Sequence, residues 1–325
     1  MHRISAIISF LLLILLLASF TWGFYAHKLI NRQAVFSLPP ELIVFYKKNI
    51  RFIEEASIDP DRRRYAVDGE AVKHYIDIDH YGDSAIYNMP RYWRDAVALY
   101  TEDTLRTYGI VPWQIYFSYQ QLRDAFFVKD PKRILRLSAD LGHYIADAHV
   151  PLHTTKNYNG QFSNQYGIHA FWESRLPELF AESYDMFVGK ATYLPQPQLE
   201  AWRAVTSANM ALDSVLSFEK RLSQKSEKHK YNYESRGTQT IKVYSQKYAT
   251  QYHEMLNGMV ERQLRSSIKM IADFWFTAWV DAGQPDLSEI INYQPTEQEL
   301  NERRESLNEW KLRIYRVREH ESENK

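Results

Sequence analysis

The stretch ADLGHYIADAHVPLHTTKNYNGQFSNQYGIHAFWE, residues 139–173, carries the most informative pattern in this chain. A residue four positions further along a helix lies about 40° round from the first, because the repeat is about 3.6 residues per turn. His143 and Asp147 therefore share one helix face, and so do His169 and Glu173. Each pair presents one imidazole and one carboxylate in the same direction.

A third histidine lies between the two pairs. Pro151 is expected to stop the first helix, which leaves His153 just beyond its end and close to the same side. Imidazole and carboxylate groups without cysteine suit zinc or a similar divalent metal. One pair alone is more often a satisfied polar pair in a helical core. Two pairs with a histidine between them favour a metal site.

Helical patterns dominate the chain, with no repeats and no alternation of strands and helices. Asp130 and Pro131 form an N-cap and first-turn pair for the helix that carries His143. A loop-rich connection is expected over residues 59–83. Further helices are expected over 27–36, 40–48, 49–56, 91–100, 112–128, 198–225 and 244–282. The pattern predicts one mostly helical, all-α domain over residues 22–290.

Residues 1–21 have the pattern of a secretory signal, with an arginine before an apolar run from Ile4 to Phe20. This run of 17 residues is at the short end of what spans a bilayer, so an uncleaved anchor is the alternative. Ser19 and Thr21 are small enough to precede a cleavage site before Trp22. We expect cleavage, and a mature protein that is periplasmic, secreted or envelope-associated.

The composition excludes several classes of function. Forty basic and forty acidic residues cancel, so any attraction to nucleic acid or anionic lipid must be local. The absence of cysteine excludes zinc ribbons, thiol nucleophiles and thioredoxin-type chemistry. A chain of 325 residues with 45% apolar side chains can bury a substantial core.

Two segments have the character of additions to the helical core. Residues 220–247 contain eight Lys or Arg against two Glu, with tyrosines interleaved, which suits a single-stranded nucleic acid but also a solvated linker. Residues 291–325 form a charged C-terminal tail in which Thr296 and Glu299 match a capping box. We expect this tail to be an amphipathic helix docked on its own domain; pairing with a second chain is the alternative.

The sequence resembles the superfamily of zinc-dependent phospholipase C and S1/P1 nuclease from Trp22 to about Asp286. The most specific part is HYIADAHVPLH followed by HAFWE, which resembles the H-x3-D-x5-H and H-x3-[DE] motifs of that superfamily. WGFYAH, which begins at Trp22, resembles the mature N-terminus of the nuclease branch. The spacing from Asp59 to His74 is similar too.

The resemblance implies a helical bundle with three zinc ions in a cleft. One ion would be held by Asp59, His74 and His143, and Asp147 would bridge it to a second. The second would also be bound by His27 and by the amino group and carbonyl of Trp22. The complete implied ligand set is Trp22, His27, Asp59, His74, His143, Asp147, His153, His169 and Glu173.

Clustered dications bind phosphate oxygens, acidify a water and stabilise the leaving oxygen, so hydrolysis of a phosphodiester follows. Asp147 would hold two ions at bridging distance, and Asp59 is placed to orient or deprotonate the attacking water. The expected protein is an exported tri-zinc phosphoesterase. Its substrate would be a nucleic acid, a nucleotide or a phospholipid, the last with a transient membrane contact.

Three residues decide between the branches of the superfamily. Arg62 follows Asp59 at the D-x-x-R spacing of the nucleases, where an Arg stabilises the pentacoordinate phosphate. Tyr75 resembles the aromatic that stacks on a base, and Asp77 the carboxylate that accepts from a base edge. These residues slightly favour a nuclease-like substrate. The alternatives are a phospholipase C that acts on phospholipid head groups, and a non-catalytic envelope protein stabilised by metal.

Overall fold

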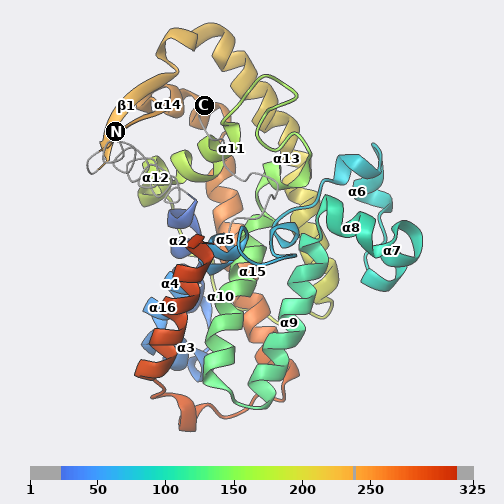
Figure 1. The fold of residues 1–325 in the computed structure, drawn as a ribbon, viewed down its shortest axis with the longest axis vertical. Helices are drawn as coiled ribbons and strands as arrows, with labels where there is room; N and C mark the ends of the chain where they lie inside the picture. Colours follow the sequence, from blue (N-terminus) through green and yellow to red (C-terminus); the bar gives the residue numbers. More distant parts are fainter. Residues whose placement is uncertain (1–22, 237–238, 313–325) are drawn as a thin grey trace, which may run out of the picture.

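The computed structural model describes residues 23–236 and 239–312, and within them the fold is a helical bundle with one antiparallel hairpin (Figure 1). The predicted all-α class is therefore confirmed. The longer helices are α2 (Phe24–Ala34), α3 (Pro40–Lys48), α4 (Ile50–Ala56), α7 (Trp93–Tyr100), α8 (Glu102–Tyr108), α9 (Val111–Phe127), α10 (Pro131–Asp147), α13 (Pro197–Ser226), α14 (Gln246–Met255), α15 (Met259–Asp281) and α16 (Glu297–Leu312). Shorter ones are α5 (Asp59–Arg63), α6 (Ala85–Asn88), α11 (Ile168–Ala170) and α12 (Leu176–Phe180). The described part of the chain holds no helix both long and apolar enough for a bilayer crossing.

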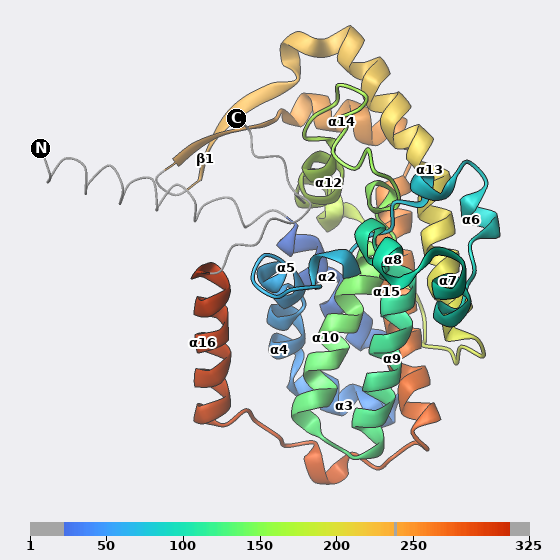
Figure 2. The same ribbon diagram turned by 45° about the vertical axis from the view of Figure 1, so that its right-hand side comes forward.

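Helix α10 is the centre of the bundle, with α9, α15, α4 and α2 packed around it (Figure 2). Its start follows the expected cap, because the Asp130 side chain accepts a hydrogen bond from the Arg133 backbone N–H at 3.0 Å. It ends at Asp147, and Pro151 opens a 3₁₀ turn over Pro151–Thr154. His153 lies in this turn, as the position of the proline predicts.

Two segments differ from the sequence expectation. The helix expected over 244–282 is broken into α14 and α15, because Asn257 and Gly258 adopt positive φ of 47° and 74°. Residues 231–244, expected as linker or nucleic-acid contact, form a hairpin of β1 (Tyr231–Arg236) and β2 (Gln239–Tyr244). The ring of Phe171 stacks on Tyr244 at a centroid distance of 3.8 Å and ties this hairpin to the helical body.

The C-terminal helix α16 begins with the predicted capping box. Thr296 N–H donates to the Glu299 carboxylate at 2.8 Å, and Glu299 N–H donates back to Thr296 Oγ1 at 3.2 Å. The helix contacts α5, as expected of a tail docked on its own domain. None of its side chains is buried, however, and the strongest contact is the ion pair of Arg303 with Asp59 at 3.0 Å. Charge, rather than an apolar stripe, holds the tail.

Close packing of α10 against α2 positions His27 beside the α10 ligands. At Gly142 a Cβ atom would lie 2.0 Å from Asn31 Oδ1, and the Asn31 amide donates to the His27 carbonyl at 3.0 Å. Asn31 is fully buried, so it has no room to yield. The absence of a side chain at position 142 thus sets the approach of the two helices.

We predict that Gly142→Ala lowers the free energy of unfolding by about 1–3 kcal/mol through overpacking. In an uncrowded helix the same change raises the free energy of unfolding by up to about 1 kcal/mol. The sign of the change therefore shows whether position 142 is crowded. Asn31→Ala combined with Gly142→Ala should recover part of the loss, because the two sites share one contact. Denaturant unfolding measures both, and a Gly142→Ala protein at least as stable as the parent would contradict the packing argument.

Candidate metal centre

Eight buried side chains from six separate elements of the chain converge between α2, α5 and α10. They are His27 on α2, Asp61 on α5, His74 after a 3₁₀ turn, His143 and Asp147 on α10, His153 in the turn after it, and His169 and Glu173 around α11. None exceeds 7% exposure. They form four groups of three, in which the ligand atoms all lie within 4.8 Å of one another.

The first group centres on Asp147. Its Oδ2 lies 2.9 Å from His74 Nδ1 and 3.2 Å from His143 Nε2, and these two nitrogens are 3.0 Å apart. Asp61 Oδ1, which forms another group with His27 and His143, lies 3.6 Å from each of these nitrogens. Two imidazoles and two carboxylates therefore face one point.

The second group joins the turn after α10 to the helix that follows. His153 Nε2 and His169 Nε2 are 2.9 Å apart, and Glu173 Oε2 lies 2.7 Å from His169 Nε2 and 3.4 Å from His153 Nε2. The four-residue spacing of His169 and Glu173 brings them to one side, as the sequence predicts.

His27 lies between these groups. Its Nε2 is 3.5 Å from Asp147 Oδ1 and 3.5 Å from Glu173 Oε1. Asp147 and Glu173 thus each direct one oxygen to His27 and the other to a neighbouring group. This is the arrangement of bridging carboxylates. The sequence predicts it for Asp147, and the structure adds Glu173.

The donor set fits zinc. Ligand atoms at bond lengths of about 2.0–2.1 Å in a tetrahedral site are separated by about 3.3 Å, close to the observed spacings. His143 Nδ1 lies 2.8 Å from the Ser57 carbonyl, and His153 Nδ1 lies 2.8 Å from the His74 carbonyl. Donation to these carbonyls leaves each Nε2 lone pair aimed into its group.

The electrostatics of the centre favour cations. Burial alone would lower the pKa of His27, but the neighbouring Glu173 and Asp147 carboxylates raise it to about 9. Burial lowers the pKa of His74 to about 4, so this imidazole is neutral and able to ligate. The imidazoles of His143 and His153 outweigh burial and hold the pKa of Asp147 well below its ordinary value. Buried carboxylates that stay ionised require positive charge nearby.

Local backbone structure places Glu173. Residues Phe171–Arg175 form a π-helical turn between α11 and α12, a distortion that often occurs at functional sites. Gly167 opens this segment with a positive φ of 88°, a conformation that glycine adopts without strain. One continuous helical segment therefore carries two of the three residues of the second group, His169 and Glu173.

The structure does not bring Asp59, a predicted ligand, into the four groups. Asp59 is ion-paired with Arg303 at 3.0 Å and with Arg62 at 3.1 Å, and Asp61 occupies the place expected for it beside His74. The physical reason is that two residues two positions apart on a helix point about 200° apart, so only one of the two carboxylates can face the metal centre.

The sequence contains a signal for Asp61, which is not among the predicted ligands. Arg64 follows Asp61 at the same D-x-x-R spacing as Arg62 follows Asp59, and its Nη1 lies 3.9 Å from Asp61 Oδ1. Arg64 is buried, at 3% exposure.

The predicted substrate contacts, Arg62, Tyr75 and Asp77, are paired or buried in the structure. Arg62 contacts Asp59 and lies 5.7 Å from the ring centroid of Phe24. Tyr75 is 6% exposed and packs against the turn at Gly109, where it leaves no space for a Cβ atom. Asp77 is 7% exposed. Trp22 lies outside the described residues, as does the predicted signal sequence.

A layer of charged residues supports the first group from outside. Arg63 donates to both oxygens of Asp140 at 3.0 Å and pairs with Glu70 at 3.0 Å, and Tyr144 also donates to Glu70. Burial alone would raise the pKa of Glu70, but Arg63 and Lys73 lower it to about 2. Glu70 lies 3.9 Å from His74 Nε2, so an ionised carboxylate helps to orient that ring.

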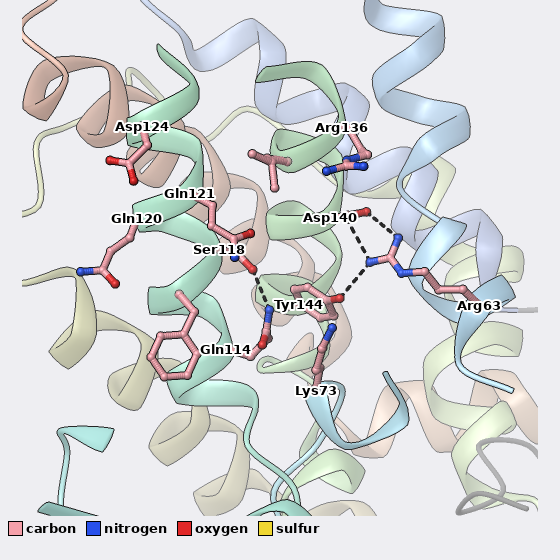
Figure 3. A pocket seen from close by; sticks show the side chains of 12 residues that line it. Arg63, Lys73, Gln114, Ser118, Gln120, Gln121, Asp124, Arg136, Asp140 and Tyr144 are labelled. Atoms are coloured by element: carbon pink, nitrogen blue, oxygen red, sulfur yellow. Dashed lines mark hydrogen bonds and ion pairs between the residues drawn. The ribbon is translucent and has the colours of Figure 1, made fainter. Parts of the chain in front are cut away.

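A cavity of about 490 Å³ opens between α9 and α10 on the outer side of this layer (Figure 3). Its lining includes Arg63, Asp140 and Tyr144, whose hydrogen bonds are drawn, and the amides of Gln120 and Gln121 across from them. The metal ligands do not line it. The cavity therefore lies beside the metal centre rather than over it.

Comparisons with known proteins identify the family of the chain. The family model for zinc dependent phospholipase C matches residues 26–255. Among solved structures, the chain is similar to a crystal structure of Clostridium perfringens alpha-toxin from avian strain SWCP, with 14% identity and a TM-score of 0.43. That match covers 83% of this chain, and the chain spans 66% of the length of the toxin. The search of curated proteins found no match. Because the family model covers well over half of the sequence, the chain belongs to the zinc-dependent phospholipase C family.

Proposed function

We propose that this protein is a zinc-dependent phospholipase C, which hydrolyses the phosphodiester bond between the lipid and its head group. The observation that carries the proposal is the family match over residues 26–255, which spans all eight converging side chains. The slight preference for a nuclease drawn from the sequence is not supported by this match. The phospholipase alternative fits it better.

The ligand assignment follows from the distances. Asp61, His74, His143 and Asp147 would hold one zinc ion. A second would lie between His27, Asp147 and Glu173, with Trp22 as a further predicted ligand outside the described residues. His153, His169 and Glu173 would hold a third.

Bound zinc supplies positive charge for the phosphate oxygens and acidifies the attacking water. The protein side chains supply the placement. In both Asp147 and Glu173, one carboxylate oxygen faces His27 and the other faces a neighbouring group. These two residues therefore fix the spacing between the groups. Asp61 takes over the role predicted for Asp59, that of orienting the water and accepting its proton, and Arg64 beside it balances its charge. Burial of every ligand below 8% exposure keeps bulk water from competing.

The nuclease alternative rests on Arg62, Tyr75 and Asp77. Tyr75 and Asp77 are buried, which argues against a free aromatic platform for a base. Arg62 pairs with Asp59, which belongs to none of the four groups. The nuclease alternative is therefore tested together with the phospholipase in one hydrolysis screen. Export of the protein remains a proposal that rests on the sequence of residues 1–21.

The substrate class is tested by a hydrolysis screen. Purified mature protein should hydrolyse phosphatidylcholine, should act far more slowly on single-stranded DNA, RNA and 3′-nucleotides, and should lose activity with a chelator. Asp147→Asn should abolish hydrolysis, because one residue serves two groups. Full activity of that variant, or a preference for nucleic acid, would refute the proposal.

The corrected ligand is tested by a matched pair of variants. Asp61→Asn should weaken zinc binding by about tenfold or more, because a charged ligand becomes neutral. Asp59→Asn should retain zinc but release α16, because it removes the partner of Arg303. Elemental analysis after dialysis against a competing chelator measures the first effect, and limited proteolysis near residues 292–300 measures the second. The reverse pattern would restore Asp59 as the ligand.

Zinc binding should release protons at neutral pH. Without zinc, the pKa of about 9 keeps His27 protonated at pH 7, and a metal must displace that proton. Zinc affinity should therefore rise with pH until about pH 9. Titration calorimetry in two buffers of different ionisation enthalpy detects the release. Equal apparent enthalpies in the two buffers would contradict the prediction.

A further inference from the structure

One face of the β1–β2 hairpin is exposed and carries tyrosine and lysine together. The register pairs Tyr231 with Tyr244 and Tyr233 with Lys242, so these four side chains share a face. Tyr244 is buried at the base, whereas Tyr231 is 40% and Tyr233 is 67% exposed. Lys242 Nζ lies 3.9 Å from the Tyr231 ring centroid, a cation–π contact. The outer part of this face is amphipathic.

The loop between His153 and His169 touches the hairpin at its base and exposes two further aromatic rings. It runs from His153 to His169 and exposes Phe162 at 71% and Tyr166 at 61%. Tyr244 OH donates to the Tyr166 carbonyl at 3.4 Å, so the loop and the hairpin touch. We call the exposed rings of Tyr231, Tyr233, Phe162 and Tyr166, with Lys242, the aromatic rim.

The aromatic rim is attached to the metal centre through one helical turn. Arg175 lies two residues beyond Glu173, donates to the Tyr244 carbonyl at 3.2 Å and pairs with Glu234 of β1. Phe171 of the same turn stacks on Tyr244. Arg175 is 5% exposed, so this anchor is buried and fixes the rim relative to Glu173.

Local charge around the aromatic rim is positive. Lys228 precedes β1 and Lys247 follows β2, and both are exposed. Arg221 and Lys225 at the end of α13 are exposed as well. Of the two acidic residues in 220–247, Glu234 is neutralised by Arg175. An overall neutral protein therefore has a local cationic region beside exposed aromatic rings.

We propose that the aromatic rim docks on a bilayer that contains anionic phospholipid, and so brings the metal centre to the lipid head groups. Tyrosine and phenylalanine rings partition into the head-group region of a bilayer, and each nearby lysine or arginine adds attraction to anionic lipid. The proposal rests on the proposed phospholipase function, for which substrate lies in such a surface. It commits the tyrosine-rich basic segment to lipid rather than to single-stranded nucleic acid.

The test is vesicle co-sedimentation of the zinc-loaded protein during a brief incubation on ice. Vesicles of phosphatidylcholine with about one third phosphatidylglycerol should bind the protein, and added salt should weaken binding. Tyr233→Ser combined with Lys242→Glu should weaken it about tenfold or more. Phe162→Ser with Tyr166→Ser should also weaken it, and this second pair lies outside the hairpin.

A matched control uses residues far from the rim. Phe127 is 73% exposed and ends α9 at the lower end of the bundle, and Lys47 is exposed on α3, an element that also lies at the end of the bundle away from the hairpin (Figure 1). Phe127→Ser with Lys47→Glu makes the same changes in charge and ring area and should leave vesicle binding intact. Circular dichroism and zinc content establish that each variant is folded.

The outcomes separate this inference from the proposed function. Vesicle binding through the rim without hydrolysis of any phospholipid would defeat the proposed function alone. Hydrolysis of a monomeric short-chain phospholipid without vesicle binding would overturn the docking proposal alone. Equal binding losses in the rim and control variants would also overturn it. So would retention of single-stranded DNA by the rim residues in the absence of vesicle binding.

Discussion

The structure depends on the burial of three carboxylates among five imidazoles. Asp61, Asp147 and Glu173 lie below 8% exposure, where an ionised carboxylate is stable only beside positive charge. The imidazoles supply part of that charge, and the raised pKa of His27 shows that the carboxylates outweigh it. Within the groups, His153 Nε2 lies 2.9 Å from His169 Nε2, and His143 Nε2 lies 3.0 Å from His74 Nδ1, so ring nitrogens face one another. Divalent cations satisfy both demands at once.

Helix α10 makes this convergence possible. It brings His143 and Asp147 to one face, while the bare Cα of Gly142 lets α2 approach closely enough for His27 to reach Asp147. On another face of α10, Asp140 and Tyr144 bind Arg63 and Glu70 and so stabilise the surroundings of His74. Residues that never touch a metal thus decide where its ligands lie.

The sequence predicts what depends on local periodicity and fails where distant segments compete. The pairs His143/Asp147 and His169/Glu173 follow from helix geometry, and seven of the eight converging residues were foreseen. Asp61 was missed because Asp59 and Asp61 are both aspartates on one short helix, and the sequence alone does not show which of them faces the other ligand residues. The sequence also does not show that Asp59 pairs with Arg303, which lies 244 residues away. The hairpin was missed for the same reason, since Phe171 and Arg175 hold it from outside its own segment.

The π-helical turn over Phe171–Arg175 links chemistry to surface. Glu173 faces the metal centre, and Arg175, two positions on, faces the hairpin, because alternate residues of a helix point in nearly opposite directions. A single buried turn therefore serves two tasks whose demands differ: a fixed carboxylate position for metal, and an anchor for an exposed strand pair. The same turn is too short to be stable alone, so packing on both sides maintains it. Loss of the hairpin would consequently be felt at Glu173, and the metal would stabilise the hairpin in return.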